Sequence, residues 1–261
     1  MGREQVIAKL QARPWFKATS SSLRELLLEL PWETCAGFLT DLAARPDELG
    51  GVRVIALADL LIPDTSPIFG IFAVFQVQVL KDLQLVYWYQ YFSWRQGPES
   101  GSKGVVLVRR GGRITHIVVM RGDSFAVGGS TFDGIGGFAE PTEVGVTGML
   151  NRFRTEIGEE LGLPELRLEE VIPLGRMYPD RGMTNNHPHL FAAVISGDEA
   201  ARLGEGEAPN PDPWEMRSGP VVVPVEALWG PQGFVMQNDD SYFGTCMARL
   251  VALGLLTPTV P

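Results

Sequence analysis

The strongest pattern in this chain begins with Gly136-Gly137-Phe138-Ala139-Glu140-Pro141-Thr142-Glu143 and ends with Glu156-Ile157-Gly158-Glu159-Glu160-Leu161-Gly162-Leu163. The first part is a glycine turn that carries carboxylates. The second part places three more carboxylates within one short helical segment. Because hard divalent cations prefer oxygen ligands, the pattern predicts a site for such a cation. A cation held there would bind phosphate.

A helical wheel of the second part separates charged from apolar side chains. The charged arc spans roughly 100° and holds Arg152, Glu156, Glu159 and Glu160. Beside it lies an apolar stripe that can pack on a core, formed by Val146, Phe153, Ile157 and Leu161. The other interpretation is an amphipathic helix whose acidic face is only solvated, which is the commoner case.

The glycine turn and the acidic helix together resemble the signature of the Nudix hydrolases. That signature runs from a glycine through a glutamate to an Arg-Glu pair, a Glu-Glu pair and a final glycine. Gly137 and Glu143 match its opening, and its close is matched by Glu156, Ile157, Glu159, Glu160, Gly162 and Leu163. The resemblance implies an α+β protein with a Nudix-type α/β/α sandwich and a mixed sheet.

Two departures from the Nudix signature affect the helix. Eleven residues rather than seven separate Glu143 from the position of the signature arginine, which Thr155 occupies. Four extra residues are close to one helical turn, so the faces stay nearly in phase. In the family this arginine braces the adjacent glutamate, but Arg154 points away from the acids. Since Arg152 lies four residues before Glu156, we expect Arg152 to replace the missing arginine.

The resemblance also implies roles for the acidic residues. Glu159 and Glu160 are the first expected ligands of Mg²⁺ or Mn²⁺, and the carbonyl of Gly137 is a further one. Glu156 is expected to act as a metal ligand or as the general base, with Arg152 beside it. Three close carboxylates would raise one another's pKa, so cation binding should weaken at low pH.

A second resemblance lies downstream, in residues 176–191, which look like the substrate loop of ADP-ribose and nucleotide-sugar pyrophosphatases. Pro179 stands near the position of a proline in those enzymes. His187 lies where relatives often carry a catalytic glutamate, so His187 or His189 is an alternative acid or base, unless it packs structurally. Surface charge is likewise the alternative role of four candidate phosphate ligands: Arg109, Arg121, Arg176 and Arg181.

The implied activity is hydrolysis of the pyrophosphate bond in a nucleoside diphosphate linked to another group. Such hydrolysis needs cations to neutralise phosphate oxygens and a base to activate water. The alternative is a catalytically degenerate Nudix-fold sensor or assembly subunit that binds a nucleotide without cutting it. Thr155 and the four-residue insertion favour this alternative. The three glutamates favour the enzyme, because a binding module has little reason to hold like charges together.

Composition limits the partners of the chain. With 261 residues, 45% of them hydrophobic, it can bury a substantial core. A net charge of −9 argues against nucleic-acid binding, which relies on a basic surface. Two cysteines, Cys35 and Cys246, are too few for a disulfide framework or a cysteine zinc site. Without a signal peptide or a long apolar run, we expect a cytoplasmic protein that does not bind membranes.

The chain is predicted to divide into an N-terminal region, residues 1–96, and a Nudix-like domain, residues 97–261. Helices are expected in the first fifty residues, with a capping box at Ser22-Leu23-Arg24-Glu25 and a second helix from Pro31. Aromatic strands are expected at residues 69–80 and 85–94. Their apolar faces indicate deep burial or a subunit contact, which leaves a homodimer open. Covering the active site and docking a partner are the alternative roles of the region, and composition does not separate them.

In the second domain, residues 105–121 are expected to form a hairpin around Gly111-Gly112. Strands are expected at residues 166–174 and 221–225, and residues 205–213 read as an acidic loop. A terminal helix is expected at residues 241–255, capped by Asp239 or Asp240.

Overall fold

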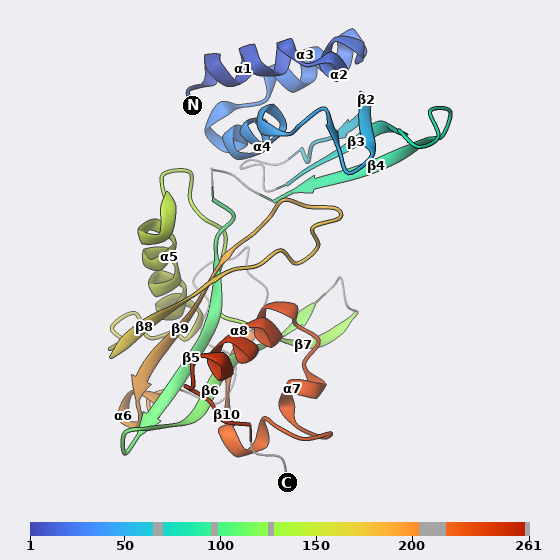
Figure 1. Ribbon diagram of the computed structural model, residues 1–261. Coiled ribbons are helices and arrows are strands. Elements are labelled where there is room, and N and C mark those ends of the chain that lie inside the picture. Colours follow the sequence, from blue (N-terminus) through green and yellow to red (C-terminus); the bar gives the residue numbers. More distant parts are fainter. Residues whose placement is uncertain (65–69, 95–98, 125–127, 204–217, 259–261) are drawn as a thin grey trace. The chain divides into compact units, whose positions relative to one another are not determined.

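The computed structural model describes residues 1–64, 70–94, 99–124, 128–203 and 218–258 (Figure 1). The chain divides into two compact units. Unit 1 comprises Met1–Ser100, Phe138–Val144 and Tyr178–His187, and unit 2 comprises Gly101–Gly137, Gly145–Met177 and Pro188–Pro261. The boundary predicted between residues 96 and 97 lies outside the described residues. No described helix is long and apolar enough to cross a membrane.

Unit 1 begins with four helices: α1 (Arg3–Ala12), α2 (Pro14–Ala18), α3 (Ser21–Glu29) and α4 (Trp32–Ala44). Pro31 precedes α4 directly, as predicted. The capping box predicted at Ser22 is wrong, because Ser22 lies inside α3. Instead, the extended backbone of Ser20 lets its hydroxyl accept the N–H of Leu23 at 3.4 Å.

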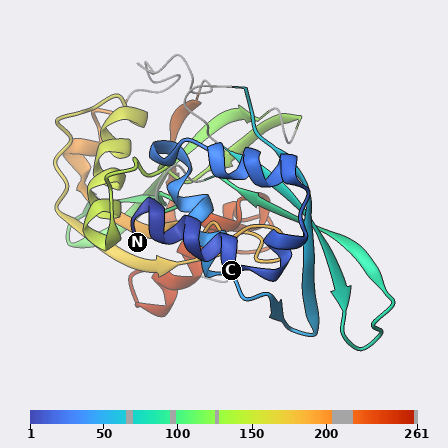
Figure 2. The same cartoon turned by 90° about the horizontal axis from the view of Figure 1, so that it is seen from above.

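The sheet of unit 1 is antiparallel and has the order β1-β2-β3-β4. Its strands are β1 (Glu48–Leu49), β2 (Val52–Leu61), β3 (Ile71–Val79) and β4 (Val86–Ser93). The two views show the helices gathered along one side of this sheet (Figure 1, Figure 2). They share with it one apolar core, in which Phe38 of α4 stacks on Tyr91 of β4 with ring centroids 5.9 Å apart.

Deep burial or a subunit contact was expected for the aromatic residues in β4. Deep burial is confirmed for Tyr91, which is fully buried, whereas Trp88 is 58% exposed and is not part of the core. The reason is topological. Trp88 alternates with Tyr91 on edge strand β4, so it lies on the face away from the helices, where more than half of it stays exposed.

A later segment of the chain, Tyr178–His187, is also part of unit 1. The N–H of Phe92 in β4 donates to the carbonyl of Met183 at 2.9 Å, and Phe92 forms a parallel bridge with Thr184. The hydroxyl of Tyr89 donates to the carbonyl of Gly182. The predicted substrate loop is therefore fixed on β4 by backbone contacts.

Unit 2 is built on a six-stranded sheet with the order β10-β6-β5-β9-β8 and with β7 paired to β6. Its strands are β5 (Ser102–Arg110), β6 (Arg113–Ser124), β7 (Gly129–Asp133), β8 (Glu170–Arg176), β9 (His189–Ser196) and β10 (Ser218–Pro224). Only the β5–β9 pair is parallel among the described strands. The predicted mixed sheet is thus confirmed.

The two longer helices of unit 2, α5 (Gly145–Glu160) and α8 (Ser241–Ala252), both contact β5 and β9. Phe153 of α5 stacks on Phe191 at 5.4 Å, on one face of β9. Phe243 of α8 packs in a core with Leu190, which points to the opposite face. The helices therefore cover opposite faces of the sheet. The described part of the unit also contains three short helices: α6 (Gly197–Ala200), η1 (Val225–Ala227) and α7 (Phe234–Gln237).

The hairpin predicted around Gly111-Gly112 is confirmed. Both glycines have positive φ, of 56° and 76°, which the tight turn between β5 and β6 requires. The strand predicted at residues 166–174 begins later, at Glu170. Leu166 is still part of a turn, because its N–H donates a hydrogen bond to the carbonyl of Leu163. The acidic loop predicted at residues 205–213 lies outside the described residues.

Candidate functional site

Glu156 lies on the buried side of α5, and two contacts fix its carboxylate. Its Oε1 forms an ion pair with Nη1 of Arg152 at 3.5 Å, and the two side chains are only 6% and 15% exposed. Gly137 approaches the same carboxylate so closely that a Cβ on Gly137 would lie 2.2 Å from Oε1. A side chain at Gly137 would therefore displace the Glu156 carboxylate or the turn, so the glycine turn and the acidic helix pack directly against each other.

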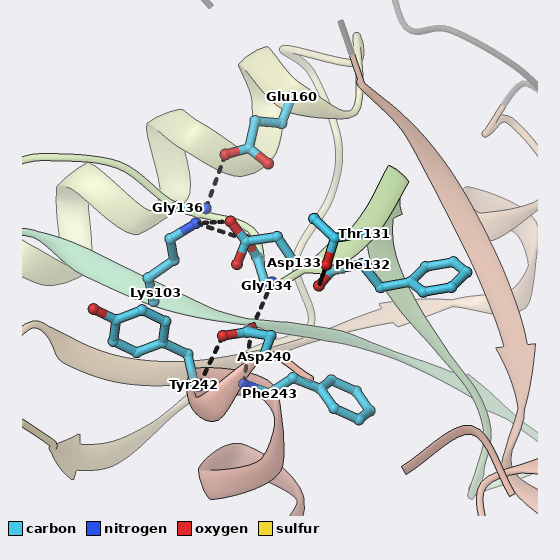
Figure 3. Close-up of polar contacts among 10 residues, drawn as sticks. All are labelled: Lys103, Thr131, Phe132, Asp133, Gly134, Gly136, Glu160, Asp240, Tyr242 and Phe243. Atoms are coloured by element: carbon cyan, nitrogen blue, oxygen red, sulfur yellow. Dashed lines mark hydrogen bonds and ion pairs between the residues drawn. The ribbon is translucent and has the colours of Figure 1, made fainter. Parts of the chain in front are cut away.

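Glu160 lies one helical turn after Glu156 and faces the same glycine turn. Its Oε1 accepts the N–H of Gly136 at 2.9 Å (Figure 3). Burial raises the pKa of Glu160 to about 8, although Lys103 and the Gly136 N–H lower it. Repulsion by Glu156 raises this pKa as well, but less than burial does. The expected repulsion between neighbouring carboxylates is therefore present at Glu160, and burial is the larger cause of its raised pKa.

Lys103, which sequence analysis did not single out, brings a positive charge to this acidic group. From β5, its Nζ donates to Oδ2 of Asp133 at 2.7 Å and to the carbonyl of Gly134 at 3.1 Å (Figure 3). Burial lowers the pKa of Lys103, but Asp133, Glu160 and Asp240 raise it above its ordinary value. The lysine is therefore cationic at neutral pH.

Asp240 links the N-terminus of α8 to the same group of charges. Its carboxylate accepts the N–H groups of Tyr242 at 2.9 Å and Phe243 at 3.0 Å, which confirms the predicted cap. It also accepts the N–H of Gly134 at 3.2 Å (Figure 3). Burial, followed by the charge of Asp133, raises the pKa of Asp240. Lys103 thus lies among three carboxylates that come from different parts of unit 2.

The fit of these residues to Mg²⁺ or Mn²⁺ depends on two carboxylates. Glu156 and Glu160 are hard oxygen donors one turn apart, which suits such a cation. Glu159, in contrast, is exposed, and the carbonyl of Gly137 already accepts the N–H of Ser102 at 3.0 Å. Across the described ranges, no three Asp, Glu, His or Cys side chains gather in a metal-binding cluster. Water and substrate would have to supply the remaining ligands.

The arginines predicted to bind phosphate lie in different surroundings. Arg109, near the far end of β5 from Lys103, forms ion pairs with Glu169 at 3.0 Å and Glu170 at 3.1 Å. Arg121 lies over the ring of Phe132, at 5.9 Å from the centroid. Their role in phosphate binding stays a prediction, and for Arg109 it would require breaking two ion pairs.

Arg176 is exposed at the end of β8, where its carbonyl accepts a hydrogen bond from Arg249 at 2.7 Å. Pro179, Arg181 and His187 belong to the segment of unit 1 that pairs with β4. The contacts that these four residues are expected to make with substrate also stay a prediction.

The two candidate histidines differ in burial. The backbone N–H of His187 donates to the Ser100 hydroxyl at 2.9 Å, and its Nδ1 lies 2.7 Å from the carbonyl of Asn185. The ring of His189 is 4% exposed and stacks on Phe191 at 6.3 Å. This burial supports the structural alternative for His189.

Neither a protein-family signature nor a curated protein sequence matches this chain. Among solved structures, the chain is similar to one described as the crystal structure of an ADP compounds hydrolase. The two are 10% identical, the match covers 77% of this chain and 96% of the other, and the TM-score is 0.49. A structural similarity with so low an identity and TM-score supports no assignment of activity to this chain.

Proposed function

We propose that the protein uses Mg²⁺ or Mn²⁺ to hydrolyse the pyrophosphate bond of a nucleoside diphosphate joined to another group. The substrate would be of the ADP-ribose or nucleotide-sugar type, and the products would be two monophosphates. One observation carries the proposal. Two consecutive glycines, Gly136 and Gly137, lie against Glu160 and Glu156, so a backbone turn and two carboxylates converge on one turn of α5.

Glu156 and Glu160 would hold the cation, and Glu159 and the Gly137 carbonyl are proposed as further ligands. A bound divalent cation supplies charge neutralisation at the phosphate oxygens and lowers the pKa of water. Arg152 compensates the charge of Glu156 and holds its carboxylate in place. Glu156 also remains the candidate for the general base, because a carboxylate can accept a proton from water.

Six residues are proposed to contact the substrate: Arg109, Arg121, Arg176, Pro179, Arg181 and His187. The arginines would pair with phosphate oxygens, for which the guanidinium group is well suited. His187 would bind or exchange a proton with the second half of the substrate.

A second candidate function is a nucleotide-binding sensor or assembly subunit without hydrolytic activity, and Lys103 favours it. Its ammonium lies 2.7 Å from Asp133 and also acts on Glu160 and Asp240. A permanent positive charge there compensates carboxylates that a divalent cation would otherwise neutralise. Binding could then persist where hydrolysis is lost.

The test is an assay of the whole protein against ADP-ribose, nucleotide sugars, NAD and dinucleoside polyphosphates, with Mg²⁺ or Mn²⁺, resolving products by chromatography. We expect monophosphate release that stops with a chelator and falls at least a hundredfold in Glu160→Gln. The matched control is Glu165→Gln, because Glu165 is exposed, and it should retain full activity. No turnover of any substrate, with nucleotide binding retained, would favour the sensor.

A further inference from the structure

Unit 1 contains a cavity that the proposed function does not use. Its volume is about 240 Å³. It lies between the sheet and the helices, at the C-terminal end of α4. The residues that line it include Trp15, Arg45, Val52, Phe75, Tyr87 and Tyr89.

The cavity forms where the helices stop covering the sheet. Trp15 of α2 is 3% exposed and packs edge-on against Phe75 of β3, with ring centroids 5.5 Å apart, so the inner wall is closed and aromatic. Tyr87, which also lines the cavity and lies at the start of β4, is 39% exposed. One end of the cavity is therefore buried and the other is open.

Of the described residues that line the cavity, Arg45 is the one that carries a charge. Its Cζ lies 3.8 Å from the centroid of the Tyr91 ring, and its Nε is buried without a hydrogen-bond partner. The carboxylates next in sequence pair elsewhere, Asp47 with Arg13 at 3.5 Å and Glu48 with Arg53 at 3.0 Å. Among the described residues, no ion pair to Arg45 is formed. Because no described carboxylate neutralises the guanidinium, an anion in the cavity could take that place.

We propose that this cavity binds a small planar carboxylate. One aromatic ring would lie among Trp15, Phe75 and Tyr89, and the carboxylate would accept hydrogen bonds from the guanidinium of Arg45. Planar carboxylates match the paired donors of arginine. The size agrees, because a cavity of about 150 Å³ holds benzene. A volume of about 240 Å³ thus accommodates one ring with a carboxylate.

The first measurement is titration of the full chain with benzoate and with its neutral isostere benzamide, by calorimetry and by Trp fluorescence. The two molecules share shape and ring, so their difference reports the charge at Arg45. We expect one saturable benzoate site and at least tenfold weaker benzamide binding. Equal affinity for the two, or no benzoate binding, would overturn the proposal.

Two variants and a matched control test whether benzoate binds in this cavity. Arg45→Met should reduce benzoate affinity at least tenfold and abolish the preference over benzamide. Arg53→Met removes the same charge from an exposed arginine that does not line the cavity, and it should bind benzoate as the wild type does. Val52→Phe, which fills the cavity from its open side, should abolish binding of both molecules.

These variants keep the test decisive even if Arg45 also supports the fold through its contact with Tyr91. Thermal unfolding of each variant is measured first. If Arg45→Met does not fold, the wild-type comparison and Val52→Phe decide the outcome. Unchanged benzoate binding in folded Val52→Phe, or an equal loss in Arg53→Met and Arg45→Met, would show that the ligand does not bind in this cavity.

Discussion

Arg152 and Glu156 form an ion pair of 3.5 Å on the buried side of α5, four residues apart in the chain. The pair supplies an arginine beside the glutamate although Thr155 occupies the position where a Nudix signature has one. Because both side chains are largely buried, neither charge has easy access to water. The pair therefore matters for stability as well as for the position of the Glu156 carboxylate.

Replacing Arg152 with methionine should lower the free energy of unfolding by about 2–4 kcal/mol, since it removes the arginine that pairs with the buried Glu156 carboxylate. Urea unfolding at pH 7 measures this. Arg154→Met is the control, because Arg154 is exposed and its loss should cost less than about 0.5 kcal/mol. In a double-mutant cycle, Glu156→Gln should cost less in the Arg152→Met background than in the wild type. Additive losses would show that the pair is not coupled.

Gly137→Ala should disturb the acidic site directly. Its Cβ would lie 2.2 Å from Oε1 of Glu156, so the turn or the carboxylate must move. We expect a loss of about 1–3 kcal/mol of stability, together with the loss of any metal-dependent hydrolysis. Gly129→Ala is the matched control, because a Cβ there meets nothing within 4 Å. Wild-type metal binding and activity in Gly137→Ala would contradict the proposed geometry.

Lys103→Met tests how much the positive charge of Lys103 stabilises the nearby carboxylates of Asp133 and Asp240. Removing the ammonium leaves Asp133 and Asp240 without their cation, so the variant should be less stable by about 2 kcal/mol or more at pH 7. Lys81 is exposed, and Lys81→Met provides the comparison in the same denaturation assay. A Lys103→Met protein as stable as Lys81→Met would mean that this cluster contributes nothing to folding.

Tyr91 predicts an alkaline loss of stability in unit 1. Burial raises the pKa of Tyr91 from 10.0 to about 12, against a smaller lowering by Arg45. The neutral phenol is therefore favoured by folding. Its contribution is complete below pH 10 and is lost as the pH rises from 10 through 12.

The loss should reach about 2–3 kcal/mol over that window. Denaturation of wild type and Tyr91→Phe from about two units below to about 1.5 units above the ordinary tyrosine pKa, roughly pH 8 to pH 11.5, measures it. The advantage of the wild type over the variant should shrink with rising pH. A constant difference between the two proteins would contradict a raised pKa at Tyr91.

Features set by neighbouring residues were predicted from the sequence. The Arg152–Glu156 pair follows from helical spacing, the β5–β6 turn from two adjacent glycines, and the cap at Asp240 from its place before an apolar helix. Each depends on residues within about one helical turn or one tight turn, so periodicity and turn chemistry suffice to predict it.

Features assembled from distant residues were missed. Lys103, Asp133 and Asp240 meet only because β5, the end of β7 and the start of α8 converge, and no local pattern marks that meeting. Strand β2 was missed for another reason. Register shifts between Val54 and Ala56 and between Leu57 and Asp59 break the alternation by which a strand is recognised.

The most direct test of the central claim is a crystal of the protein soaked with Mn²⁺ at neutral pH, with anomalous scattering used to locate the metal. The account predicts a Mn²⁺ peak bound by the carboxylates of Glu156 and Glu160 beside the Gly136-Gly137 turn. An ordered site without metal at those two carboxylates, at a Mn²⁺ concentration that loads other carboxylates of the crystal, would contradict it.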